Sequence, residues 1–418
     1  MKKFTLLLFV FTAISTAFAQ KVTVILKSGY VMHLYNASAE DLVFSNSGSV
    51  LTIQGNSYNT GELTGIQVEK DATVEMNRSI TVDFASSNAT VTMTADIVPY
   101  IDLTVNGAYV SAITNDTTYA DTITYNLSGS TTEGAFIANG KHASVINLNG
   151  VSISNSDTAA INFLNGKYVD VNVSGTNSFV DGASGGQKGA FFINGHARFA
   201  GDGDINITGN ARHGYRSDEY TIFSEDFTGN FNVLSSAVDG INVQQYLQID
   251  NGTITIENNI GDGIDVGFTN DATDVNNGML YINGGTVTAK TNSVDTKAIK
   301  ADTLITITGG RVNAYANADG SKGISSGGDF YITGGYIYAE GPGSSITVTL
   351  EDGTTDKKNC RALRSVKDFY YRGGTIDIQN ASETTWRVKG IFYYLQSALT
   401  GIVDRSILPT ADGGYKKL

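Results

Sequence analysis

The stretch from Val238 to Gly335 decides the fold, because two short phrases alternate along it. One phrase is a charged residue, then Gly or Ala, then an apolar residue: DGI at 239, DGI at 262, KAI at 297 and KGI at 322. The other is Gly followed by alternating β-forming residues: NGTITI at 251, GGTVTA at 284, GGRVNA at 309 and GGYIYA at 334. A pair of phrases that keeps returning in this way is typical of stacked-repeat proteins.

The first phrase recurs on both sides of this stretch, and its apolar third residue marks each copy. The copies end at Phe136, Ile161, Phe191, Tyr215, Ile241, Ile264, Ile299, Ile324 and Leu363. Successive copies are offset by 25, 30, 24, 26, 23, 35, 25 and 39 residues. We interpret the three longest offsets as insertions into a repeat of about 25 residues.

Each repeat consists of short runs of Val, Ile, Thr, Tyr and Phe with period two, bounded by Gly, Asn or Asp. A leucine-rich repeat would need a Leu and Asn ladder that is missing, and calcium-binding nonapeptide arrays have another period. The sequence therefore predicts an all-β fold, a right-handed parallel β-helix (solenoid) with about three strands per coil and coils ~4.8 Å apart. Residues such as Ile254 and Ile256 would point inward, and the Gly pairs would form corners with positive φ.

Four segments follow in order. Residues 1–19 are predicted to be a signal peptide, because Lys2 and Lys3 precede an apolar run that ends in Ala17-Phe18-Ala19. Residues 20–75 are predicted to form an N-terminal β module or cap, and residues 76–390 the β-helix. Residues 391–418 are expected to cover the last coil as a C-terminal cap, a short helix being one option. No later run is long enough for a membrane span, so we expect a secreted protein, periplasmic or at the cell exterior.

Charge narrows the range of partners. The formal net charge is −13, and −15 without the two lysines of the signal segment. This acidic balance, with no basic stripe, argues against nucleic acid as a partner. It also means that an acidic polysaccharide is repelled unless a cation bridges the two. The single Cys360 excludes an internal disulfide framework. The sequence leaves the oligomeric state open, and we favour a monomer.

A family resemblance rests on the order of several segments: LSGSTTEGAFIANG at 127, GQKGAFFINGHARFAGDGDINITGN at 186, SKGISSGGDFYITGG at 321 and CRALRSVKDFYYRGGTI at 360. With the phrases between them, they resemble a family of secreted bacterial carbohydrate-binding β-helix proteins over about residues 76–390. The resemblance implies a fold related to pectate lyases and calcium-dependent binding of acidic plant polysaccharide. The opening Lys27-Ser28-Gly29 is similar to leaders of secreted Bacteroidetes proteins.

Acidic residues of the first phrase form a candidate metal site. Equivalent residues of successive coils would stack in columns, so carboxylates one coil apart could share a cation. Asp239, Asn242, Asp262 and Asp265 then offer hard oxygen ligands of the kind that calcium prefers. The alternative is that Asp-Gly is only a turn and the column a solvated polar ladder. A second candidate is the inserted loop with Asp271, Asp274 and Asn276.

Basic and aromatic residues form a candidate sugar-binding face. The cations that follow the acidic coils are Lys297, Lys300, Lys322, Arg361 and Arg364, and an anionic sugar could bridge them to bound calcium. Alternatively, these charges only neutralise the stack. Candidate stacking platforms are Tyr215, Tyr220, Tyr246, Tyr331, Tyr336, Tyr338, Tyr370 and Tyr371. Tyrosines at alternating positions can equally belong to the core or to a surface ladder.

Three functions remain open from the sequence. We favour a non-catalytic binding protein for polysaccharide, and we expect an acidic polysaccharide held with calcium. A calcium-dependent polysaccharide lyase is the first alternative, because Asp239, Asp262, Asp265 and Lys297 supply the residue types for a metal and a base. A surface adhesion or structural protein is the second.

Overall fold

The computed structural model describes residues 20–27, 30–350, 352–381, 385–404 and 408–418. The predicted signal peptide, residues 1–19, lies outside the described residues. Strands joined by turns and five short 3-10 helices make up the described part, which contains no α-helix. No helix in this part of the chain has the length and apolar character to cross a membrane. Clustering of contacts divides the chain into two compact units.

The first unit contains the residues up to Arg78 together with Thr92–Pro99. Its strands are β1 (Gln20–Leu26), β2 (Val31–Ala37), β3 (Val43–Ser45), β4 (Val50–Ile53), β5 (Asn56–Asn59) and β6 (Leu63–Glu69), with 3-10 helices η1 (Ala39–Asp41), η2 (Asn46–Gly48) and η3 (Thr60–Glu62). β1 lies between β2 and β6 in an antiparallel sheet, and β3, β4 and β5 form a meander. Val22, Val24 and Tyr35 are fully buried at the centre of the core of this unit.

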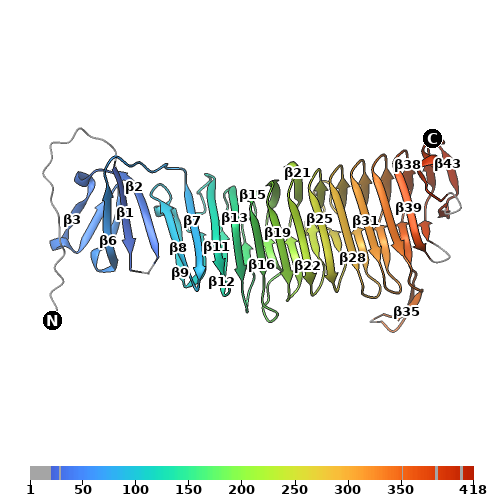
Figure 1. Ribbon diagram of the computed structural model, residues 1–418, viewed down its shortest axis with the longest axis horizontal. Helices are drawn as coiled ribbons and strands as arrows, with labels where there is room; N and C mark the ends of the chain where they lie inside the picture. Colours follow the sequence, from blue (N-terminus) through green and yellow to red (C-terminus); the bar gives the residue numbers. More distant parts are fainter. Residues whose placement is uncertain (1–19, 28–29, 351, 382–384, 405–407) are drawn as a thin grey trace. The chain divides into compact units, whose positions relative to one another are not determined.

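The second unit contains Ser79–Val91 and the residues from Tyr100 onward, and its strands follow one another side by side in Figure 1. Its first ladder comprises β9 (Ile101–Asn106), β10 (Ala108–Thr114), β12 (Gly134–Asn139), β14 (Ile161–Phe163), β17 (Gly189–Ile193), β20 (His213–Ser217), β23 (Ile241–Gln244), β26 (Ile264–Gly267), β29 (Lys297–Ala301), β32 (Lys322–Ser326), β37 (Arg361–Ser365), β40 (Trp386–Val388) and β42 (Thr410–Ala411). Only β9 and β10 pair antiparallel in this ladder.

Two further parallel ladders complete the second unit. The second ladder comprises β15 (Tyr168–Ser174), β18 (His196–Gly201), β21 (Thr221–Phe227), β24 (Tyr246–Ile249), β27 (Met279–Ile282), β30 (Leu304–Ile307), β33 (Asp329–Ile332), β38 (Phe369–Tyr371), β41 (Phe392–Tyr394) and β43 (Tyr415–Lys417). The third comprises β16 (Thr176–Val180), β19 (Asp204–Gly209), β22 (Asn230–Ser236), β25 (Thr253–Asn259), β28 (Thr286–Thr291), β31 (Arg311–Ala316), β34 (Tyr336–Gly341) and β39 (Thr375–Ala381).

Longer strands precede the second and third ladders along the chain, and their order is consistent with a β-helix. They are β7 (Ser79–Ser86), β8 (Asn88–Thr94), β11 (Ile123–Thr131) and β13 (Ser144–Ser154), with the 3-10 helix η4 (Val98–Tyr100). β13 pairs in parallel with both β15 and β16, at the start of the second and third ladders. From there the chain passes repeatedly from the first ladder to the second and the third, which confirms parallel sheets of short strands.

The register of the first ladder confirms the predicted repeat. The marker residues pair one with the next, from Phe136 with Ile161 to Ile324 with Leu363. The offsets read from the sequence are therefore the offsets of the hydrogen-bonded strands. All nine marker side chains are fully buried, and burial of an aliphatic or aromatic side chain contributes about 1.5–3 kcal/mol.

Glycine forms corners between the second and third ladders, as predicted. Gly310 has φ +71 and Gly335 has φ +80, in the left-handed region. A Cβ atom on Gly335 would lie 2.7 Å from the carbonyl oxygen of Gly309, one coil earlier. The corner therefore needs Gly both for its backbone conformation and for the close approach of the neighbouring coil.

The longest insertion and the C-terminal segment differ in structure. The insertion forms an antiparallel hairpin of β35 (Ile346–Thr349) and β36 (Thr355–Lys358), which projects from the strand series in Figure 1. Residues 391–418 contain β41, β42, β43 and the 3-10 helix η5 (Ala398–Gly401). β42 and β43 pair in parallel with β40 and β41, so the described part of this segment extends the ladders with strands rather than an α-helix.

Candidate functional site

Charged side chains stack in columns on the first ladder, as the repeat predicted. Asn242 pairs in register with Asp265, and Asp265 pairs with Lys300. The same column continues through Ser325 to Arg364 and then Arg387. A neighbouring column places Lys297, Lys322 and Arg361 on successive strands. Because each step is one strand, the like charges of the second column, and Arg364 and Arg387 in the first, follow one another at about 4.8 Å along the ladder.

The predicted metal ligands lie together, but they bind one another. The Asn242 side-chain nitrogen donates to Asp239 at 2.7 Å and to Asp265 at 3.2 Å. The second oxygen of Asp265 accepts a hydrogen bond from the Lys300 ammonium at 2.8 Å. Calcium requires six to eight oxygen ligands. Here an amide nitrogen and an ammonium group occupy the positions between the carboxylates, so these side chains as arranged do not fit calcium.

Asp262 completes this acidic cluster. One of its oxygens accepts the backbone N–H of Lys297 at 2.7 Å, and its own backbone N–H donates to Asp239 at 2.8 Å. Burial raises the pKa of Asp262 to about 6, although the nearby Lys297 charge acts in the opposite direction. Among the described residues, no group of three or more His, Cys, Asp and Glu side chains is arranged to hold a metal ion. Calcium binding stays a prediction.

The second acidic candidate is held by turn contacts. Asp271 accepts hydrogen bonds from the backbone N–H and hydroxyl of Thr273, at 2.9 and 2.6 Å. The hydroxyl of Thr269 donates to Asp274, and Asn276 accepts from the Tyr281 hydroxyl at 3.2 Å. These contacts engage one side-chain oxygen of each candidate residue in the turns of the loop or with β27.

A basic cavity lies beside the acidic cluster, and we call it the basic pocket. Its volume is about 630 Å³, and its lining residues are Lys297, Lys322, Lys357, Lys358, Arg361, Arg364, Arg387 and Lys389 with Asp295, Asp356 and Asn359. Strands β29, β32, β37 and β40 supply one side of the pocket, and the β36 end of the inserted hairpin supplies another. Eight cations around one cavity stand out in a chain with a net charge of −13.

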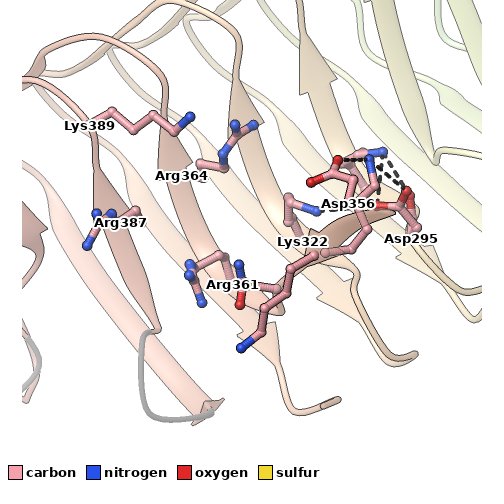
Figure 2. A pocket seen from close by; sticks show the side chains of 11 residues that line it. Asp295, Lys322, Asp356, Arg361, Arg364, Arg387 and Lys389 are labelled. Atoms are coloured by element: carbon pink, nitrogen blue, oxygen red, sulfur yellow. Dashed lines mark hydrogen bonds and ion pairs between the residues drawn. The ribbon is translucent and has the colours of Figure 1, made fainter. Parts of the chain in front are cut away.

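Charge is unevenly distributed within the pocket. Asp295 lies within 4 Å of three ammonium groups, those of Lys297 at 3.9 Å, Lys322 at 3.5 Å and Lys358 at 3.6 Å. Asp356 binds Lys358 at 2.8 Å. Figure 2 shows these two acids together at one end of the pocket, while Arg364, Arg387 and Lys389 lie toward the other end. That second end contains no lining carboxylate.

Burial lowers the pKa values of three pocket cations, and neighbouring cations add to the effect for two of them. Lys322 is nearly buried, and burial together with the charge of Lys297 lowers its pKa to about 8. Burial followed by the neighbouring guanidinium groups lowers the pKa of Arg361, and burial lowers the pKa of Arg364. An anion that entered the pocket would stabilise all three charged forms.

Two of the tyrosines predicted to stack on sugars are buried, so the prediction is wrong for them, and a third has one ring face covered by another tyrosine. Tyr215 is fully buried, because it holds the inward position of β20 between Phe191 and Ile241. Tyr371 is likewise fully buried. Tyr246 stacks on Tyr220 with 4.7 Å between ring centroids, so one face of its ring is covered.

Two other predicted platforms, Tyr331 and Tyr370, form a stack with Tyr393 on the second ladder, whereas the Tyr336 hydroxyl donates to Asp377 at 2.6 Å and Tyr338 packs on Tyr315. Tyr331, Tyr370 and Tyr393 stack with centroids 4.3 and 4.7 Å apart and their planes within 3°. The central ring is covered on both faces and cannot stack on a sugar. These tyrosines therefore support the reading of a surface ladder.

Three predicted ligand residues, Lys297, Lys322 and Arg361, line the pocket, as does Arg364. Lys300 does not line it, and instead binds Asp265 and Asp302 at 2.8 and 3.1 Å. Sequence reasoning missed Asp295, Lys357, Lys358, Arg387 and Lys389. A signal for two of them was the run Asp-Lys-Lys-Asn that ends the insertion just before Arg361.

Comparisons with known proteins agree with this fold. A solved structure titled as the polysaccharide lyase-like protein from C. thermocellum, a gadolinium derivative, matches with a TM-score of 0.50 and 19% sequence identity. The match covers 61% of this chain and 96% of that one, and at this identity it shows the fold alone. No curated protein matches the chain.

A family model described as "Carbohydrate-binding domain-containing protein" matches residues 106–388, which include all of the basic pocket except Lys389. Since these residues make up more than half of the sequence, the chain belongs to the carbohydrate-binding domain-containing family.

Proposed function

We propose that this chain is a non-catalytic protein that holds anionic polysaccharide in the basic pocket. The observation that supports the proposal is the gathering of eight Lys and Arg side chains around one cavity of a protein whose net charge is −13. Burial and then the charge of Lys297 lower the pKa of Lys322, so the charged form of this side chain is disfavoured and a bound anion would stabilise it. Family membership identifies carbohydrate as the ligand class.

The finer features of the proposal follow the sequence. We propose secretion to the periplasm or the cell exterior because Met1 to Ala19 has the pattern of a signal peptide. We propose that the three ladders close as a right-handed solenoid, because parallel strands connected by crossovers almost always have this hand. The anion would bind the pocket cations directly, with Arg361, Arg364 and Arg387 as bidentate partners for carboxylate groups.

Removal of one pocket guanidinium tests the proposal. Arg364→Gln should weaken binding of a polygalacturonate oligosaccharide by about ten- to a hundredfold, because a hydrogen bond to a charged group contributes about 1.5–3 kcal/mol. Isothermal titration calorimetry on the full chain would measure the change. Lys290→Gln is the matched control, because Lys290 lies on β28 of the third ladder and pairs with Glu257 at 2.7 Å. Equal affinity of Arg364→Gln and the unaltered protein would contradict binding in this pocket.

A further inference from the structure

The two ends of the basic pocket differ in the hydrogen bonds that they offer to a ligand. At one end, three ammonium groups surround the carboxylate of Asp295. Those of Lys297, Lys322 and Lys358 lie 3.9, 3.5 and 3.6 Å from its oxygens. All three distances exceed the roughly 2.7–2.9 Å of a direct hydrogen bond between an ammonium and a carboxylate. These four groups therefore balance charge without using up their hydrogen-bonding capacity on one another.

Two of these ammonium groups have shorter contacts with other partners. Lys322 donates to the Gly320 carbonyl at 2.8 Å. Lys358 binds the Asp356 carboxylate at 2.8 Å. Asp295 lines the pocket with 28% of its side chain exposed, so a ligand can reach its oxygens. An ionised carboxylate only accepts hydrogen bonds, and this end of the pocket therefore suits a ligand group that can donate one.

A sugar hydroxyl suits the Asp295 end better than a carboxylate does. A hydroxyl can donate its hydrogen to Asp295 and accept one from the charged Lys322 or Lys358 ammonium. A ligand carboxylate in the same place has no hydrogen to donate, so two anionic groups would lie side by side in a half-buried site. Sites that are built to hydrogen-bond a hydroxyl discriminate strongly against ligands that cannot make the bond.

The opposite end of the pocket offers a guanidinium group instead. Arg364 is half-buried and donates to the Ser325 hydroxyl at 3.4 Å, and in the described parts of the chain it forms no ion pair with a carboxylate. Figure 2 shows it at a distance from both Asp295 and Asp356. A half-buried charge without a partner is costly, and a guanidinium binds a carboxylate through two parallel hydrogen bonds. This end therefore fits the anionic group of a ligand.

Different groups of one ligand would contact the two ends. Arg364 lies one strand from Lys322 in the ladder and three residues further along, because Lys322 pairs in register with Arg361. Their backbones are then about 11 Å apart, at about 3.3 Å per residue and 4.8 Å between strands. The pocket volume of about 630 Å³ is in the range that encloses a whole small molecule, so adjoining sugars of one chain can occupy both ends.

We propose that Asp295 determines the specificity of the basic pocket, by receiving the hydroxyl groups of an uncharged sugar while Arg364 binds the anionic group of the adjoining sugar. The pocket then prefers a chain in which charged and uncharged sugars alternate over a polyuronate that is charged on every sugar. This inference rests on the proposed function, because it assumes that an anionic glycan binds in the pocket.

Two tetrasaccharides of equal length test the preference. One alternates galacturonic acid with galactose, and the other is tetragalacturonate with the same linkages. Calorimetric titration of the full chain measures both affinities. The tetragalacturonate carries twice the charge, yet we expect the alternating ligand to bind about tenfold or more tightly, the equivalent of one charged hydrogen bond. Tetragalacturonate that binds as tightly or more tightly would overturn the inference and leave the proposed function standing, whereas absence of binding by either ligand would overturn both.

Asp295→Asn tests whether this carboxylate is the cause of the preference. Asp295 has φ +56, a conformation that Asn also adopts readily, so the variant should fold. An amide can donate to a carboxylate, so we expect tetragalacturonate to bind more tightly and the preference to shrink by about tenfold.

Asp302→Asn is the matched control for the loss of one negative charge. Its side chain is 27% exposed, against 28% for Asp295, and it pairs with Lys300 at 3.1 Å outside the pocket lining. We expect this variant to keep the preference of the unaltered protein within about twofold. A preference that Asp295→Asn retains, or that Asp302→Asn loses to the same extent, would overturn the role of Asp295.

Discussion

Lys322 is the residue whose charge state should link pH to the proposed binding of an anion in the basic pocket. Its side chain is 9% exposed, its ammonium donates to the Gly320 carbonyl at 2.8 Å, and its pKa is lowered to about 8. The protonated form binds an anion, and a bound anion raises this pKa again. Affinity should therefore be greatest below pH 8 and fall as pH rises through 8, by at most about tenfold per pH unit.

Calorimetric titration with an oligouronate between pH 6 and 10 measures this dependence. Lys322→Gln should bind more weakly and lose the change near pH 8, whereas Lys322→Arg should keep its charge over the whole range. A constant affinity of the unaltered protein from pH 7 to 9.5 would show that Lys322 does not face the ligand.

At the scale of the strands and corners, close packing between coils predicts that Gly→Ala substitutions differ in their cost to stability. Gly335→Ala places a Cβ 2.7 Å from the Gly309 carbonyl oxygen, whereas Gly353 has the same φ of +80 and no atom within 4 Å. Gly353→Ala should therefore cost only the left-handed conformation, about 1–2 kcal/mol of unfolding free energy. Gly335→Ala should cost about 1–3 kcal/mol more, because the neighbouring coil must move. Urea denaturation followed by circular dichroism compares them, and equal losses would refute the contact argument.

The strand register could be predicted to the residue, because the buried third position of the first phrase repeats along the chain. The same rule would have placed Tyr215 inside the core, since it occupies the column of Ile241. The prediction failed there because tyrosine was judged by its type rather than by its position. Period two fixes which residues share a face, and the repeat fixes which face is buried.

The pocket could be predicted only in part. The repeat predicts that Lys297, Lys322 and Arg361 lie together, because equivalent residues of successive coils stack in one column. Asp295 and Lys358 do not follow, because they meet through the way in which the inserted hairpin folds back toward β29. Residues of an insertion lie outside the repeat, so the repeat register cannot predict which residues they contact.

On the scale of the whole molecule, the net charge of the protein is negative, whereas the proposed ligand site is lined mostly by cations. A net charge of −13 repels a polyanion, and this repulsion was the reason to expect a bridging calcium ion. Under the proposed function the basic pocket would replace a bridging ion, because its own cations would contact the ligand. Repulsion from the remaining surface is screened beyond about 8 Å at physiological ionic strength.

Removal of calcium therefore has a definite expected outcome. Protein dialysed against EDTA and then against metal-free buffer should bind a short oligouronate within about twofold of calcium-loaded protein, since no pocket cation is lost. A short ligand avoids the association of long polyuronate chains with one another through calcium. Asp262→Asn should likewise leave affinity unchanged, because Asp262 does not line the pocket. Loss of binding in EDTA-treated protein, restored by calcium and abolished by Asp262→Asn, would instead establish the acidic cluster as the metal site. It would also mean that Asn242 and Lys300 give up their carboxylate partners when the ion binds.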